Sequence, residues 1–226
     1  KNNPARRFNA RKKLRGKNRM MKKQKKLPIA ALLLAVLLLL PAGCGVQGGA
    51  ADTPPGGAQQ TEGKDQYQTD PVPDGKPAPV EPGDAAVDTG TQLTCTISIS
   101  CATILDNWDK CADSKKPLVP DDGVLLPATE VTFSQGESVY DVLQRVCREN
   151  KLHMESSFTP VYNSAYIEGI GNLYEFDAGS GSGWMYAVNG WYPNYGCSRY
   201  VLQDGDTVEW VYTCDLGQDV GGGFTG

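Results

Sequence analysis

The 226-residue sequence has few of the side chains from which enzymes build active sites. Its single histidine is His153, so a Ser-His-Asp or Cys-His arrangement would have to use that residue. No nucleophile motif surrounds it, and a surface or structural role is the simpler interpretation. The glycines also lack the spacing of a phosphate-binding loop. We therefore predict no catalytic residues and no enzymatic activity.

Metal-binding patterns are missing as well. No two cysteines have the CxxC spacing of zinc sites, and one histidine cannot complete a typical zinc ligand set. The segments Asp121-Asp122-Gly123 and Asp204-Gly205-Asp206 lack EF-hand spacing and are typical of turns. We predict neither a metal site nor a bound cofactor.

No apolar run is long enough for a permanent transmembrane helix. The run Ile29–Leu40 has 12 residues, whereas a helix needs about 20 to span a bilayer. It follows the lysine-rich segment 20–26 and precedes the small residues Ala42 and Gly43. This order is that of a secretory signal. Residues 1–44 are therefore predicted to be a basic n-region followed by an export signal.

The end of this signal resembles the bacterial lipobox. Ala42-Gly43 stands directly before Cys44, although Pro41 occupies the position where an aliphatic residue is usual. The resemblance implies that Cys44 receives a diacylglycerol and anchors the protein to the extracellular face of the bacterial cytoplasmic membrane. The alternatives are an ordinary secretory signal and an uncleaved anchor.

Acidic side chains are absent from residues 1–26, which hold 13 basic ones. The rest of the chain therefore carries 9 basic against 26 acidic side chains, a net charge of −17. A nucleic-acid-binding domain would show its basic face in the folded part. The charge distribution argues against a nucleic-acid partner.

Residues 45–92 have little with which to build a core. They contain 7 prolines and 9 glycines, and Tyr67 is their one aromatic residue. Such a composition cannot bury enough apolar surface to offset the loss of chain entropy. We predict a disordered, acidic tether that holds the following domain away from the membrane.

Residues 93–226 have the patterns of a folded domain. Polar and apolar residues alternate from Leu93 to Cys101, as in a half-buried strand. Ser138 and Asp141 have the spacing of a capping box, and the apolar residues from Val139 to Val146 follow at helical spacing, which predicts a helix that ends near Asn150. Further strands are expected at 124–126, 130–133, 152–158, 165–170, 184–188 and 207–213. The pattern predicts an α+β domain with a mostly antiparallel sheet and one helix.

Two tight turns are expected near the carboxyl end of this domain. Asn189-Gly190 is a strong hairpin signal, with Trp191 starting the partner strand. The second turn is Gly205-Asp206.

Six cysteines remain after Cys44, and an even number in an exported domain suggests disulfides. Cys197 and Cys214 are symmetric about the Gly205-Asp206 turn and would face each other in a simple hairpin. The disulfide candidates are Cys95, Cys101, Cys111, Cys147, Cys197 and Cys214.

Aromatic side chains are concentrated in residues 174–200, which hold eight of them. Aromatic rings beside glycines and a hairpin tip often form contact surfaces for flat ligands. Alternatively, the rings fill the core, because aromatic residues favour strands. Trp184 and Tyr186 share one face of a strand, so at least one set of these rings is expected in the core. Trp191, Tyr192 and Tyr195 follow the Asn189-Gly190 turn and are better placed for exposure. The candidate ligand-binding residues are Trp184, Tyr186, Trp191, Tyr192 and Tyr195.

Three segments carry a resemblance to a known family. They are GESVYDVL at 136–143, GWMYAVNGWYPNYGC at 183–197 and YVLQDGDTVEW at 200–210. Together they resemble the transcobalamin C-terminal-like domain of Gram-positive lipoproteins and surface proteins, over about 129–214. The resemblance implies a β-grasp-like fold, in which one helix crosses the sheet.

The resemblance also bears on function. In the animal cobalamin carriers, the similar domain is the smaller of two that clasp the corrinoid. The larger, helical domain has no counterpart within 93–226. The resemblance therefore implies a lipid-anchored binding protein for a corrinoid, such as cobalamin, or for another flat ligand. The alternative is a surface module that adheres to a wall component or binds a partner protein.

Overall fold

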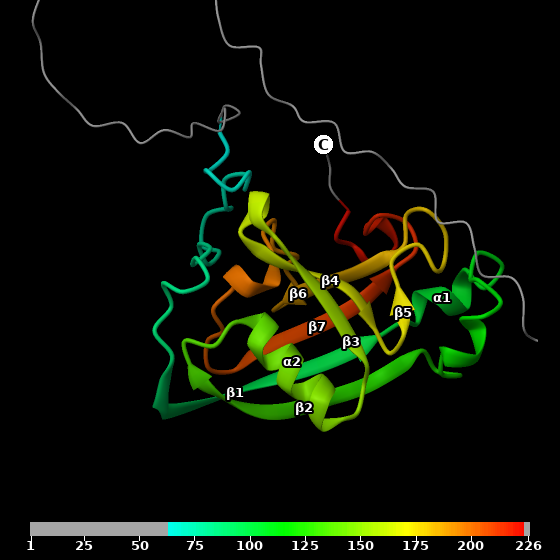
Figure 1. Ribbon diagram of the computed structural model, residues 1–226, viewed down its shortest axis with the longest axis horizontal. Helices are drawn as coiled ribbons and strands as arrows, with labels where there is room; N and C mark the ends of the chain where they lie inside the picture. The colour runs from blue at the N-terminus through cyan, green and yellow to red at the C-terminus, as the bar shows by residue number, and fades with distance from the viewer. Residues whose placement is uncertain (1–62, 224–226) are drawn as a thin grey trace, which may run out of the picture. The chain divides into compact units, whose positions relative to one another are not determined.

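The computed structural model describes residues 63–223 (Figure 1). The predicted signal 1–44, with its lipidation site at Cys44, and the first part of the predicted tether lie outside the described residues. No helix within 63–223 is long and apolar enough to cross a membrane. Seven strands and one main helix make up the described part.

Four strands form the larger sheet, in the order β2-β1-β7-β6 (Figure 1). β1 pairs antiparallel with β2 and parallel with β7, and β6 pairs antiparallel with β7. The strands are β1 (Asp88–Ser100), β2 (Val124–Gln135), β6 (Gly183–Val188) and β7 (Asp206–Thr213).

Three shorter strands form a second, antiparallel sheet in the order β3-β4-β5. They are β3 (Met154–Thr159), β4 (Ser164–Ile170) and β5 (Leu173–Tyr174). With one parallel pair among the strand pairs of the two sheets, the fold is α+β and mostly antiparallel, as the sequence predicts. The finer expectation of a β-grasp-like arrangement stays a prediction.

The main helix, α2 (Val139–Glu149), begins as the sequence predicts. The Ser138 hydroxyl accepts a hydrogen bond from the Asp141 amide at 3.2 Å, and the Asp141 carboxylate accepts one from the Ser138 amide at 2.9 Å. This capping box satisfies two backbone groups at the start of the helix. The apolar stripe is fully buried against the core: Val139, Val142, Leu143 and Val146.

The remaining helical segments are short. They are α1 (Thr103–Asp106), η1 (Lys116–Leu118), η2 (Pro160–Tyr162), η3 (Cys197–Arg199) and η4 (Gln218–Val220).

The core lies between the helix and the strands, and the period-two pattern of β1 faces it. Cys95, Ile97 and Ile99 are buried, which confirms the predicted half-buried strand. Full burial of an isoleucine side chain contributes about 1.5–3 kcal/mol of hydrophobic stabilisation. β1 begins at Asp88, earlier than predicted, because it keeps pairing with β2 as far as Gln135. For the same reason, the two short strands predicted at 124–126 and 130–133 are one strand.

The predicted Asn189-Gly190 turn is present. Both residues have positive φ, 52° and 73°, as a type I′ turn requires. The amide and carbonyl groups of Val188 and Trp191 exchange two hydrogen bonds across it. The expected partner strand does not continue beyond this bridge, because β7 pairs with β6 in its place.

The second half of the predicted tether differs from expectation. Residues 63–87, which we call the strap, form no helix or strand but contact the domain at specific points. The Val80 amide donates to the Arg199 carbonyl at 2.9 Å, and the Tyr195 hydroxyl donates to the Pro77 carbonyl at 2.7 Å. Composition alone misses such contacts because they depend on single side chains far along the chain.

The six cysteines of the described part are all buried free thiols. The structure corrects the prediction that Cys197 and Cys214 form a bridge, because the hairpin that would bring them together does not form. Cys197 begins η3, which lies against α2 and β4, while Cys214 follows the end of β7 near Thr103. No disulfide joins any two of the six candidate cysteines within residues 63–223.

Candidate functional site

Three of the five predicted ligand-binding residues lie in the core. Trp184, Tyr186 and Tyr195 have exposed fractions of 9%, 9% and 6%. The Trp184 indole donates to the Leu173 carbonyl at 2.8 Å, and the Tyr186 hydroxyl donates to the Tyr195 carbonyl at 2.8 Å. Buried polar groups with partners of this kind are typical of core aromatics. The structure therefore assigns these rings to the core, which is the second of the two interpretations.

The other two predicted residues, Trp191 and Tyr192, are half-buried. The Trp191 ring lies 6.0 Å from that of Tyr195, and the Lys76 ammonium of the strap lies 5.4 Å from its centre. The Tyr192 hydroxyl donates to the Val220 carbonyl at 2.9 Å. Segments from both ends of the described chain thus cover part of the aromatic surface, and its ligand role stays a prediction.

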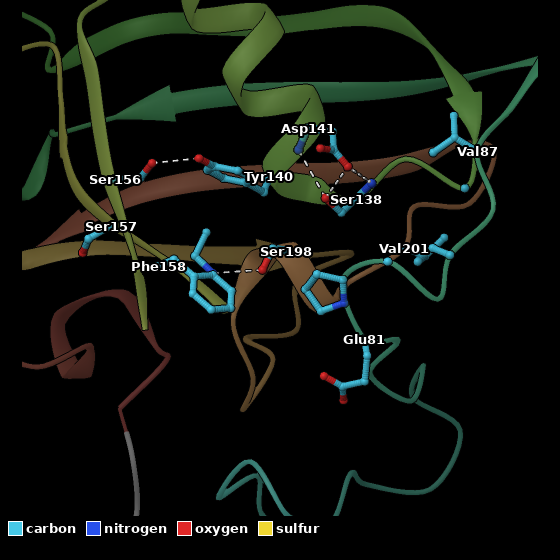
Figure 2. A pocket seen from close by; sticks show the side chains of 15 residues that line it. Glu81, Val87, Ser138, Tyr140, Asp141, Ser156, Ser157, Phe158, Ser198 and Val201 are labelled. Atoms are coloured by element: carbon cyan, nitrogen blue, oxygen red, sulfur yellow. Dashed lines mark hydrogen bonds between the residues drawn. The ribbon is translucent and has the colours of Figure 1, made fainter. Parts of the chain in front are cut away.

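A groove of about 550 Å³ lies elsewhere, between the end of the strap, the start of α2 and β3 (Figure 2). Its lining is mostly small and hydroxyl-bearing, with two aromatic rings, those of Tyr140 and Phe158. The residues that line it are Glu81, Pro82, Gly83, Ala85, Val87, Gly136, Ser138, Tyr140, Asp141, Ser156, Ser157, Phe158, Ala165, Ser198 and Val201.

Hydrogen bonds hold the polar wall of this groove in place. The hydroxyls of Tyr140 and Ser156 lie 2.8 Å apart and join α2 to β3. The Ser198 hydroxyl accepts from the Ala165 amide at 2.9 Å, which ties η3 to β4 (Figure 2). A site of this kind is largely preformed, since its polar atoms are already oriented.

The aromatic side of the groove is Phe158, which is 56% exposed. It lies on β3 next to Ser157, and Figure 2 shows both beside the groove. The ring offers an apolar face and the hydroxyls offer hydrogen bonds, so the arrangement suits a ligand with a flat face and polar edges.

The two carboxylates at the groove are already engaged. Asp141 belongs to the capping box of α2, and Glu81 accepts hydrogen bonds from Arg199 at 2.6 Å and from Asn163 at 2.6 Å. No histidine, cysteine or lysine lines this groove. Among residues 63–223, no group of three or more histidines, cysteines or carboxylates is arranged to hold a metal ion. The groove thus offers hydroxyl groups and two aromatic rings to a ligand.

Sequence reasoning missed this groove. It predicted the strand at 152–158 and the helix start at Ser138, but not that they meet the strap at one place. One signal was present, since Phe158 is a large apolar residue next to two serines on an exposed strand. The groove is built from four separated parts of the chain, and their proximity is a tertiary property.

One family model matches the chain. It is described as a domain of unknown function (DUF4430) and matches residues 136–214, just over a third of the sequence and within the segment that carries the transcobalamin-like resemblance. No curated protein matches the chain in sequence.

Two solved structures are similar to parts of the chain. Haptocorrin in complex with Cbi has a TM-score of 0.41 and 14% identity, over 56% of this chain and 26% of haptocorrin. The chain thus spans about a quarter of the length of haptocorrin. A protein from Ruminococcus gnavus ATCC 29149, described as a candidate metal binding protein, has a TM-score of 0.30 and 16% identity, over 54% of this chain and 96% of that one.

Proposed function

We propose that the domain is an exported, non-enzymatic binding module whose ligand is a small molecule with a flat apolar face and polar edges. The observation that carries the proposal is the groove beside Phe158. Its volume of about 550 Å³ falls within the roughly 300–1,000 Å³ of small-molecule sites. Its lining combines one exposed ring with oriented hydroxyls, as such sites do.

A corrinoid is the first ligand to test. The sequence resemblance to the transcobalamin C-terminal-like family supports it, and a corrin ring has a flat face with amide groups at its rim. Phe158 would contact the face, and the hydroxyls of Ser156 and Ser157 would meet the rim. Cobinamide is the better first probe because it keeps the corrin ring and lacks the nucleotide of cobalamin.

We further propose that the chain is anchored by lipid at Cys44 on the extracellular face of the cytoplasmic membrane. The signal pattern before Cys44 supports this. Each buried methylene of an acyl chain contributes about 0.8 kcal/mol, so two or more chains hold firmly. Cys44→Ala should then release the protein from membranes and abolish its labelling by a fatty-acid analogue. Unchanged labelling of that variant would contradict the anchor.

The ligand proposal is tested by calorimetric titration of the full chain with cobinamide and with cyanocobalamin. Ser157→Trp places a large side chain at the groove and should weaken binding at least about tenfold. Ser114→Trp is the matched control, because Ser114 is exposed and does not line the groove. Both variants should melt like the parent chain.

Two results would count against this proposal. If neither ligand gives a heat of binding at millimolar concentration, corrinoids are excluded as ligands. If the Ser157→Trp variant binds the ligand as tightly as the parent chain, the groove is not the binding site.

A surface module that adheres to a wall component or binds a partner protein is the second candidate, favoured by an exposed apolar patch at the end of the β3–β4 hairpin. Val161 and Tyr162 are 54% and 52% exposed, and Phe158 and Tyr166 are close to them in the chain. Exposed apolar clusters of this kind often mark interaction surfaces. The double variant Val161→Ser, Tyr162→Ser should then lose binding to isolated cell-wall sacculi. If the parent chain and the double variant bind sacculi equally well, this patch is not the adhesive surface.

A further inference from the structure

Arg199 is a fully buried cation, 1% exposed, whose side-chain partners within residues 63–223 all come from the strap. Its Nη2 lies 2.9 Å from the Asp65 carboxylate and 2.6 Å from that of Glu81. Its Nη1 donates to the Thr69 hydroxyl at 2.5 Å, and its Cζ lies 5.2 Å from the centre of the Tyr67 ring. The domain thus supplies the cation, and the strap supplies both carboxylates that pair with it.

Neighbouring side chains hold the main chain of the strap. The Asn194 amide donates to the Asp70 carbonyl at 3.0 Å, and the Tyr195 hydroxyl donates to the Pro77 carbonyl at 2.7 Å. The ring of Trp191 lies under the Lys76 ammonium. Contacts with main-chain carbonyls do not depend on the side chains of the bound segment, so they serve any extended peptide.

The strap itself has the character of a bound peptide. Residues 63–87 contain five carboxylates and five prolines and form no helix or strand. Most of the strap is exposed or half-buried, and Val72 is its one side chain packed against the core cluster. It is therefore held by polar recognition at a few points. A buried guanidinium without a partner is strongly unfavourable, so this face requires an acidic occupant.

We propose that the face formed by Trp191, Asn194, Tyr195 and Arg199, here called the peptide face, is a recognition site for an extended, acidic, proline-containing peptide. The strap is its occupant in the isolated chain, and a segment of the same chemistry in a partner protein takes its place. Arg199 reads the carboxylates, while Asn194 and Tyr195 read the main chain. The peptide face shares no residue with the lining of the groove. Glu81 of the strap both pairs with Arg199 and lines the groove, so exchange of the strap also moves one wall of the groove.

The test uses the full chain with a protease recognition sequence inserted at Gly83. This residue is exposed and lies in a turn that follows Glu81, with a φ of 98°. After cleavage, the amino-terminal fragment should remain bound to the domain during gel filtration at 10 μM. A fluorescein-labelled peptide of residues 63–82 should then replace it, measured by fluorescence anisotropy.

A matched control peptide carries Asp65→Asn and Glu81→Gln, which remove both carboxylates without touching the domain. Since hydrogen bonds to charged groups are the stronger ones, each substitution should weaken binding at least about tenfold. Tyr195→Phe in the domain should weaken both peptides by a few-fold and equally, because the lost hydrogen bond goes to the main chain.

Two outcomes of the cleavage experiment overturn the proposal. One is immediate loss of the fragment on cleavage while the circular dichroism of the domain is unchanged. The other is a control peptide that binds as well as the acidic one.

A second measurement needs no cleavage. The intact chain with Asp65→Asn and Glu81→Gln should bind the labelled acidic peptide more tightly than the parent chain, whose face is occupied, and equal binding to the two chains overturns the proposal.

Discussion

The guanidinium of Arg199 and the carboxylate of Glu81 lie 2.6 Å apart and connect segments 118 positions apart in the sequence. Glu81 lines the groove, and Arg199 is buried among the strap residues. One ion pair therefore fixes both the path of the strap and one wall of the candidate ligand site. Several consequences of this arrangement can be measured.

Acid should loosen the strap. Burial raises the pKa of Asp65, but hydrogen bonds from the Thr69 amide, the Arg199 guanidinium and the Tyr67 amide outweigh it, so the pKa lies below its ordinary 3.8. A carboxylate whose pKa is lowered by folding stabilises the folded state above its ordinary pKa, and this contribution is lost as the pH falls through the lowered value. We expect faster hydrogen exchange at the Val80 amide below about pH 4, after correction for the intrinsic rate.

Asp65→Asn is the control for this effect, because it removes the titrating group. Exchange in that variant should be fast at neutral pH and should show less dependence on acid. Equal protection of the Val80 amide at pH 6 and pH 2.5 in the parent chain would contradict the expectation.

Loss of the helix cap should destabilise α2. Ser138→Ala removes the acceptor of the Asp141 amide and the hydroxyl that lies 2.6 Å from the Asp141 carboxylate. Such substitutions cost about 0.5–2 kcal/mol of unfolding free energy, measured here by urea denaturation. Ser138→Thr keeps the oxygen and should recover most of the loss. A Ser138→Ala chain as stable as the parent would show that the cap is not important here.

Gly196 leaves no room for a side chain. It has an ordinary φ of −71°, but an added Cβ would overlap the Ser164 hydroxyl. Because Ser164 is buried, Gly196→Ala should cost about 1–3 kcal/mol, as overpacked sites do. Gly183→Ala is the matched control, since the nearest atom to its Cβ would be 3.7 Å away. Similar melting temperatures for the two variants would contradict this account.

The thiols should be unreactive in the native protein. Burial raises the pKa of Cys101 and of Cys147 to about 12, and that of Cys95 to about 11. Because the thiolate is the reactive form, Ellman's reagent at pH 8 should react slowly with the native Cys44→Ala chain. In denaturant, without reductant, all six remaining thiols should react. A lower count would show bridges and restore the disulfide prediction.

The elements that sequence reasoning predicted correctly are those encoded by near neighbours. The alternation in Leu93–Cys101, the Ser138–Asp141 cap and the Asn189-Gly190 turn each depend on a few adjacent residues. The Cys197–Cys214 inference failed because it assumed that neighbouring segments pair. The parallel pairing of β1 with β7 joins strands more than a hundred positions apart, and no local pattern marks it.

The sequence by itself thus determined the α+β class, the helix with its cap and the tight turn, and it supports the export signal as a prediction. Tertiary structure alone decided that Trp184, Tyr186 and Tyr195 fill the core, that a groove forms beside Phe158, and that the acidic strap lies on Arg199. The physical reason is the range of the interactions. Helix caps and strand periodicity act within a few residues, whereas burial, a groove and a buried ion pair depend on which distant segments meet.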